Sequence, residues 1–290
     1  MANSIQAAPS VLADGVIASL KNKLPVLRSF STAFTSSAQQ AGKTIQVPLI
    51  GAQTATEFGA SGYTSQDDIT ITKADVTLKH FKVSTRVSPL DIKDYGIGFF
   101  MNNFSVTAAN ALSQAIMDDI NAKILVANFS TDVVSGAALS YAEVLSAKKL
   151  LDDAKASEPR VLVLNNKYTQ DLLGDSTITG ANGLGAQVIS QGRVGTLAGA
   201  EVYQWSNLAN NSQDLGGFYA GADSIAVATA LPYSEIPGWD TAIGTDADTG
   251  LSVQILMGQE QSGYFNVTAT ILAGSAIGRA SSLCRFETTV

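Results

Sequence analysis

The run ITITKADVTLKHFKVSTRVSPLDIK, residues 69–93, contains the transition on which the fold depends. Its first part is dense in threonine and valine, and apolar residues alternate with polar ones as in a β-strand. The apolar positions change phase near residues 79–80, which indicates a bulge or a strong twist. The tetrapeptide SPLD, residues 88–91, then has the spacing of a helix N-cap, a first-turn proline and a first-turn acid. The run therefore predicts a long strand that leads directly into a helix.

A second strand pattern lies upstream, at residues 45–49, where isoleucine, valine and leucine occupy every second position. Pro48 has no N–H to donate to a β-ladder, so this strand is expected at a sheet edge. A polar, glycine-rich segment, residues 51–68, joins the two strand patterns. Residues 43–87 therefore predict an extended hairpin. Because two strands alone are hardly stable in water, the hairpin must lie on another surface.

Downstream of the hairpin, an apolar residue at about every fourth position predicts a long helix over residues 103–128, which would be about 37 Å long. The apolar stripe consists of Phe104, Ala108, Leu112, Ile116, Ile120 and Ile124. Asp118, Asp119 and Lys123 are expected on its solvent-exposed face.

Three further local signals follow this helix. Ser140 and Glu143 have capping-box spacing and predict a helix that continues to about residue 155. The continuous apolar run at residues 161–164 predicts a buried strand, and Asn165 is expected to cap the helix after it. Near the C-terminus, strands are expected at residues 251–257, 264–272 and 276–286.

The order of these parts predicts an α+β fold in which one segment is inserted into a domain built from both flanks. Residues 1–42, rich in serine, alanine and glutamine, are interpreted as an N-terminal arm that needs a partner to become ordered. The C-terminal strands must pair outside the middle segment, so residues 158–245 are interpreted as the insertion. Residues 88–157 and 246–290 would then form the domain that receives it.

The composition limits the classes of function. The 290 residues include 46% apolar and only 15% charged residues, so the surface must be hydrated by uncharged polar groups or covered by partners. A net charge of −7 argues against a protein that grips nucleic acid, although it suits one that encloses nucleic acid without sticking to it. Residues 1–15 lack a secretory-signal pattern and no apolar run approaches ~20 residues, so the chain is expected to be soluble and cytoplasmic at synthesis.

The order of elements resembles the major capsid proteins of tailed bacteriophages, which have the Hong Kong 97 type of fold. The stretches that carry the resemblance are RVLVLNNKY at 160–168, GTLAGAEVY at 195–203, AGADSIAVA at 220–228 and GSAIGRA at 274–280. The resemblance implies an N-terminal arm at 1–42, an extended hairpin loop at 43–87, a peripheral domain at 88–157 and 246–290 with its spine helix at 103–128, and an axial domain at 158–245.

The resemblance also implies a function. The chain would assemble with its own copies, as hexamers and pentamers, into an icosahedral shell that encloses double-stranded DNA without sequence-specific binding. Portal and scaffolding proteins, and a cement protein in some phages, would be its partners. The chain would be part of the virion and would be assembled in the host cytoplasm. Some family members cross-link a lysine to an asparagine; Lys73, Lys79 and Lys82 lie in the hairpin, but no motif identifies an acceptor, so this chemistry is not inferred.

Two alternatives stay open at the level of sequence. The first is the shell of a bacterial nanocompartment, which has the same fold and would be distinguished by its cargo. The second is a strand-rich tail or surface protein, which would predict repeats or a trimeric coiled coil, and neither pattern is visible in the sequence.

No catalytic, cofactor-binding or metal-binding residues are predicted. His80 and Cys284 are the only histidine and cysteine, and they are interpreted as a strand residue and a buried thiol. The adjacent carboxylates are interpreted as solvated faces; they are Asp67 with Asp68, Asp118 with Asp119, and Asp152 with Asp153. Residues 246–250 resemble only the start of a calcium loop, and the glycines at 180–185 lack dinucleotide-binding spacing. The Asn-x-Ser/Thr matches are interpreted as chance; they begin at Asn103, Asn128, Asn210 and Asn266.

Overall fold

The protein is described from a computed structural model, which covers residues 8–50, 71–135, 138–180, 195–206, 208, 213–232, 237–247, 249–260 and 262–288. The described α-helices are α1 (Ala8–Lys23), α2 (Pro89–Tyr95), α3 (Ile97–Asn121), α4 (Tyr141–Asp153), α5 (Asn166–Gly174) and α6 (Ser176–Thr179). Short 3₁₀ turns, η2 (Pro25–Ser29) and η4 (Ala280–Ser282), join some of the strands and helices. The mixture of helices and sheets agrees with the predicted α+β class.

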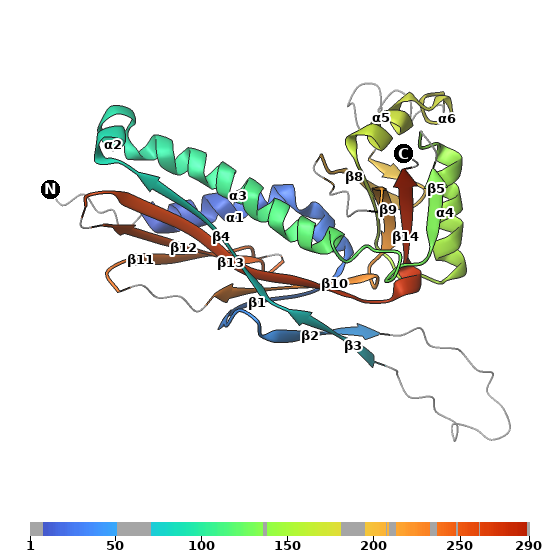
Figure 1. Ribbon diagram of the computed structural model, residues 1–290, viewed down its shortest axis with the longest axis horizontal. Helices are drawn as coiled ribbons and strands as arrows, with labels where there is room; N and C mark the ends of the chain where they lie inside the picture. The colour runs from blue at the N-terminus through green and yellow to red at the C-terminus, as the bar shows by residue number, and fades with distance from the viewer. Residues whose placement is uncertain are drawn as a thin grey trace, which may run out of the picture.

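The first sheet forms the long body of the molecule and lies under α3 (Figure 1). Its strands are β1 (Ser31–Gln39), β4 (Lys79–Val87), β10 (Ile225–Pro232), β11 (Asp240–Thr245), β12 (Ser252–Gln259) and β13 (Phe265–Ile277). The strand order is β1-β10-β13-β12-β11, and β4 pairs in addition with β13. All these pairings are antiparallel except that of β1 with β10. The parallel pair joins the N-terminal strand to a strand almost 200 positions later in the chain.

The second sheet builds a separate lobe with α4, α5 and α6 (Figure 1). Its strands are β5 (Asp132–Ser135), β6 (Arg160–Leu164), β7 (Thr196–Leu197), β8 (Ala200–Gln204), β9 (Leu215–Gly221) and β14 (Leu283–Thr288). They run in the order β5-β14-β9-β6-β8-β7, so the last strand of the chain lies near the middle of this sheet.

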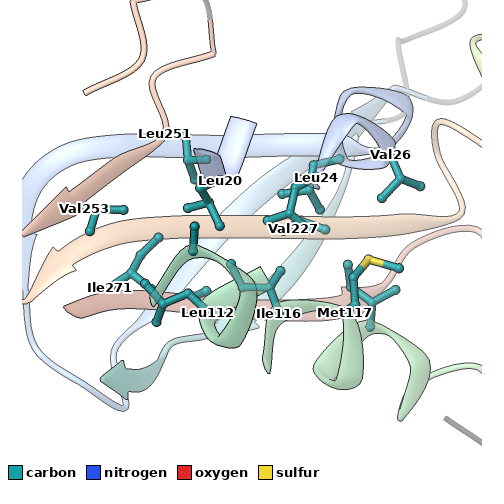
Figure 2. Close-up of a cluster of buried hydrophobic side chains, with 14 of the residues drawn as sticks. Leu20, Leu24, Val26, Leu112, Ile116, Met117, Val227, Leu251, Val253 and Ile271 are labelled. Carbon is teal, nitrogen blue, oxygen red and sulfur yellow. The ribbon is translucent and has the colours of Figure 1, made fainter. Parts of the chain in front are cut away.

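The main core lies between the first sheet and two helices, α1 and α3, and continues onto one face of the second sheet. Figure 2 shows part of it, with Leu20 of α1 and Leu112 of α3 gathered with residues of the sheet such as Val253 and Ile271. A second core lies under α4 and α5 on the other face of the second sheet, and includes Tyr168 and Phe286.

The predicted helix caps are confirmed. Ser88 caps α2 and accepts a hydrogen bond from the Asp91 N–H at 3.1 Å. Ser140 and Glu143 form a complete capping box at the start of α4. Asn165 accepts from the Tyr168 N–H at 2.8 Å and begins α5 after the fully buried strand β6. These caps depend on contacts three residues apart, which the sequence alone specifies.

The long helix is confirmed, but its limits and its wet face differ from the prediction. α3 begins at Ile97, six residues before the predicted start, because only Gly96, at φ +77°, separates it from α2. It ends at Asn121, and Ile124 is buried beyond its end. Asp119 is only 7% exposed, so its expected place on the solvent-exposed face is wrong.

The interpretation of residues 1–42 as an arm that needs a partner is wrong for the described part of that segment. α1 contacts α3, β11 and β12 of its own chain. Its core residues are at most 7% exposed; they are Leu12, Ala13, Val16, Ile17 and Leu20. β1 then pairs with β10. The helix is only weakly amphipathic, and it packs on strands that lie more than 200 residues further along the chain.

The strands do not follow the predicted domain limits. β10 and β11 lie within the predicted insertion 158–245, yet both belong to the first sheet. Conversely α4, β5 and β14 come from the flanking segments and pack in the second lobe. The C-terminal strands at 264–272 and 276–286 are also not as predicted, since β13 is continuous from Phe265 to Ile277 and the break comes at η4.

The hairpin region is confirmed as strands but consists of three elements. β2 (Thr44–Ile50) and β3 (Ile71–Thr77) form a two-stranded antiparallel sheet, so Pro48 is on an edge as expected. The change of phase predicted at residues 79–80 corresponds to a break at Leu78, after which β4 joins the first sheet. The predicted polar tip, residues 51–68, lies outside the described residues.

Candidate interaction surface

The residues with catalytic potential do not come together. His80 is exposed on β4, where its Nε2 hydrogen-bonds the Thr270 hydroxyl, and burial together with Lys82 lowers the pKa of its imidazole. Cys284 is completely buried in the second core, and burial raises the pKa of its thiol to about 12. The two side chains belong to different sheets, and a neutral buried thiol is a poor nucleophile.

The carboxylates are held by ion pairs and hydrogen bonds. Asp152 accepts from Lys148 Nζ at 2.5 Å and from Arg160, and these two donors hold the pKa of its carboxyl below the ordinary value. Asp246 accepts from Lys21 Nζ at 2.8 Å and from the Thr249 hydroxyl, which likewise lower the pKa of its carboxyl.

No group of three or more potential metal ligands occurs within the part of the chain that the structure describes. Asp67 and Asp68 lie outside that part, as do Asp248 and most of the glycine-rich segment 180–185. No helix among the described residues is both long and apolar enough to cross a membrane.

A cavity of about 780 Å³ opens between α1, α3 and β8. Its lining includes Asn22, Lys23, Gln114 and Trp205, but no histidine, cysteine or carboxylate. Lys23 and Tyr203 are the ionisable residues in the described lining.

Among the described residues, three large apolar side chains along α2 and the start of α3 are more than half exposed. The exposed fractions are 73% for Leu90, 66% for Tyr95 and 54% for Phe99. We call these three residues the corner patch. The Tyr95 and Phe99 ring centroids are 5.8 Å apart, and both rings also contact Phe100. None of the seven residues of α2 is buried, so this helix covers little of its own chain and presents its apolar side chains to the outside.

The second exposed feature is the β2–β3 sheet. One face of its base packs on the first sheet, because Val47 and Val76 are at most 1% exposed and lie in a cluster with alanines of β10. Leu49, near the end of β2, is also only 8% exposed, so the packed face runs along most of the described sheet. Figure 1 shows this sheet on the side of the first sheet away from α3. The β2–β3 sheet and α2, which carries Leu90 and Tyr95 of the corner patch, therefore lie in different parts of the molecule (Figure 1).

The sequence reasoning found the hairpin but missed the corner patch. A signal was present: α2 carries apolar residues around its circumference and is followed by the pair Phe99-Phe100. α2 also carries Asp91, Lys93 and Asp94, so its composition does not decide between a buried and an exposed helix, and only the structure shows that it is exposed.

Comparisons with known proteins agree with this arrangement of parts. A family model described as a phage capsid protein matches residues 100–242, about half of the chain. No curated protein sequence matches significantly.

Solved structures show the same fold at low sequence identity. The capsid of cyanophage P-SCSP1u matches with a TM-score of 0.57 and 13% identity, over 90% of this chain and 87% of that chain. The capsid of Ralstonia phage GP4 matches with a TM-score of 0.55 and 11% identity, over 91% and 90%. A structure from Mycobacterium phage Che8 matches with a TM-score of 0.52 and 19% identity, over 84% of each chain.

The alternative of a tail or surface protein is not supported, because the similar structures are capsids and their fold extends over most of this chain. The family model likewise describes a structural protein and not an enzyme. The chain has the fold of phage capsid proteins, and its residues 100–242 match their family model.

Proposed function

We propose that copies of this capsid protein assemble as hexamers and pentamers of an icosahedral shell, with the part of the predicted hairpin that precedes β4, residues 43–77, lying across an adjacent copy. The observation that carries this proposal is the β2–β3 sheet, which consists of two strands and extends from the body of the molecule. A two-stranded sheet gains stability when a further surface covers it. One face of this sheet already packs on the first sheet of its own chain, and its other face, which carries the exposed Gln46, Pro48 and Lys73, would meet a neighbour.

The positions of the exposed features favour head-to-tail contacts. The corner patch and the hairpin lie toward opposite ends of the molecule (Figure 1). Contacts between unlike surfaces repeat around a ring and close when the rotation between copies allows it. The corner patch, with its three large exposed apolar side chains, would be buried by such a contact.

The two lobes would have separate tasks. The long body, to which residues 88–157 and 246–290 contribute most of α3, β12 and β13, would be the peripheral domain. The lobe around the second sheet, which contains most of the described residues of 158–221, would meet its copies around a symmetry axis as the axial domain. The N-terminal segment 1–42 would contribute an intersubunit contact only through residues outside the packed α1 and β1.

The shell would enclose the double-stranded DNA of the phage without sequence-specific binding. The net charge of −7 supports this, because an acidic protein does not hold the DNA backbone tightly. Portal and scaffolding proteins, and in some phages a cement protein, would take part in assembly, and assembly would take place in the host cytoplasm.

The test is electron microscopy of the expressed full-length chain and of two matched variants. One variant changes the corner patch to serine (Leu90→Ser, Tyr95→Ser, Phe99→Ser), and the control changes Lys93 and Asp94 of the same helix to serine. We expect closed shells from the parent and the control, and folded but unassembled subunits from the corner-patch variant. Equal shell yields from both variants would contradict the role of the corner patch. Particles from the native source that contain a cargo protein instead of DNA would favour a nanocompartment.

A further inference from the structure

We infer that the root of the hairpin is an anchor that fixes the direction of the hairpin relative to α3, and that Lys79, Asp119 and Gly274 are its positioning residues. Together with Ser275 we call these residues the hairpin anchor. The inference deepens the proposed function, because an extension that must land on a neighbour has to leave the body in a defined direction.

The first part of the anchor is the backbone at Leu78, between β3 and β4. The Leu78 N–H donates to the Lys43 carbonyl at 3.0 Å, and the Leu78 carbonyl accepts from the Gly42 N–H at 2.8 Å. Both sides of the hairpin are therefore tied together where they leave the body. The Leu78 side chain is 1% exposed and packs against β10 and β13, which holds this junction on the first sheet.

The second part is a close backbone crossing at Gly274 of β13. A Cβ atom at position 274 would lie 2.3 Å from the Thr77 carbonyl oxygen and 3.1 Å from Val76 Cγ1. The first of these contacts is with backbone, so no side-chain rotation relieves it. The end of β3 thus rests on β13 in a way that only glycine permits at position 274.

The third part is a buried carboxylate that joins three elements. Asp119 of α3 accepts from Lys79 Nζ of β4 through Oδ1 at 2.5 Å. Its Oδ2 accepts from the Ser275 hydroxyl of β13 at 2.6 Å. The Asp119 side chain is 4% exposed, so both carboxylate oxygens are satisfied by this chain and not by bulk water.

The position of Asp119 in α3 is unfavourable for a buried carboxylate without a partner. It lies in the last turn of α3, where the helix dipole disfavours a negative charge. A buried carboxylate at this end of a helix needs a cation, and Lys79 supplies it across from the first residue of β4. The ion pair therefore connects α3 to the first residue of β4, at the root of the hairpin.

The strand alternation explains why the anchor has two sides. Leu78 points to the sheet face that carries the hairpin base, and Lys79 points to the opposite face, toward α3, together with Phe81 and Val83. A rotation of the β2–β3 sheet about Leu78 would have to move the Thr77 carbonyl off Gly274, and the Lys79–Asp119 pair holds the first residue after Leu78 against such a movement.

The test measures the direction of the hairpin in unassembled subunits. Spin labels at Lys73→Cys on β3 and Val106→Cys on α3, both exposed positions, report the distance between hairpin and spine by pulsed electron resonance. The native Cys284 is completely buried and stays unlabelled. The anchor variant is Lys79→Met. The matched control is Lys82→Met, which removes a lysine from the other face of the same strand.

We expect a narrow distance distribution in the parent and in the Lys82→Met control, and a shifted or broader distribution in Lys79→Met, with Lys79→Arg restoring the parent distribution. Gly274→Ala should shift the distribution as well. Because Lys79 is 56% exposed, its variants should remain folded, as circular dichroism will verify. Identical distributions in Lys79→Met and Lys82→Met would overturn the inference. Since the measurement uses single subunits, it is independent of whether shells form, so failure of the proposed function is scored separately by microscopy.

Discussion

Replacing Leu20 by alanine tests whether the N-terminal helix is an integral part of the subunit core. Leu20 is completely buried in the cluster that also contains Leu112 and Leu251 (Figure 2). Removing the outer carbons of such a leucine leaves a cavity that the neighbouring sheet and α3 cannot fill by relaxing. The loss of stability is expected to be about 3 kcal/mol, within the range of ~2–5 kcal/mol for buried leucine-to-alanine changes.

This loss converts into a measurable shift. At ~2 cal/mol/K of unfolding entropy per residue, a chain of 290 residues loses about 5 °C in its unfolding midpoint for this change in stability. The assay is calorimetry or urea unfolding of unassembled subunits at low concentration, followed by tryptophan fluorescence.

The matched control is Val11→Ala on the same helix, because Val11 is 69% exposed. It should change the stability by no more than ~0.5 kcal/mol. If Leu20→Ala were no more destabilising than Val11→Ala, α1 would not be packed as described, and an arm that becomes ordered only against a partner would be the better account.

Three further predictions concern other parts of the structure. Gly258→Ala places a Cβ 2.5 Å from the Trp239 ring, so the indole must move, and a shift in tryptophan fluorescence is expected; an unchanged spectrum would contradict the packing. Cys284, with its pKa raised from 9.0 to about 12, should resist thiol reagents at pH 8 until the chain unfolds, and rapid labelling of folded protein would refute this. The contribution of the neutral thiol to stability is complete below pH 9.0 and should be lost as pH rises from 9.0 toward 12. Asp175 accepts from the first N–H of α4 and from α6, so Asp175→Ala should cost about 1–2 kcal/mol in urea unfolding and Asp175→Asn much less; equal costs would argue against capping.

The sequence predicted best those features that depend on near neighbours. The caps at Ser88, Ser140 and Asn165 each follow from residues within four positions, and the structure has all three. The strands of the hairpin and the phase change close to Leu78 also follow from local alternation. These signals were sufficient to order the elements, and that order carried the resemblance to capsid proteins.

The features that were missed depend on contacts between distant parts of the chain. Asp119 looks like one of two adjacent exposed acids until Lys79 and Ser275 are placed around it, 40 and 156 positions away. The burial of α1 requires β11 and β12, and the division between the two sheets requires the pairing of β10 with β13. A periodic pattern identifies an apolar face but does not say which surface covers it.

The corner patch was missed for a different reason, because its apolar residues are exposed and not buried within the chain. Leu90, Tyr95 and Phe99 have the composition of a buried helix face, and a single chain would normally cover them. In the proposed shell a neighbouring copy would cover them, and a single sequence does not distinguish burial within a subunit from burial between subunits.

The most direct test of the central claim is a cryo-electron microscopy reconstruction of the particles that the purified full-length chain forms. We expect closed icosahedral shells in which residues 43–77 of each copy lie across an adjacent copy. Filaments, single subunits under every assembly condition, or shells whose hairpins contact only their own subunit would contradict it.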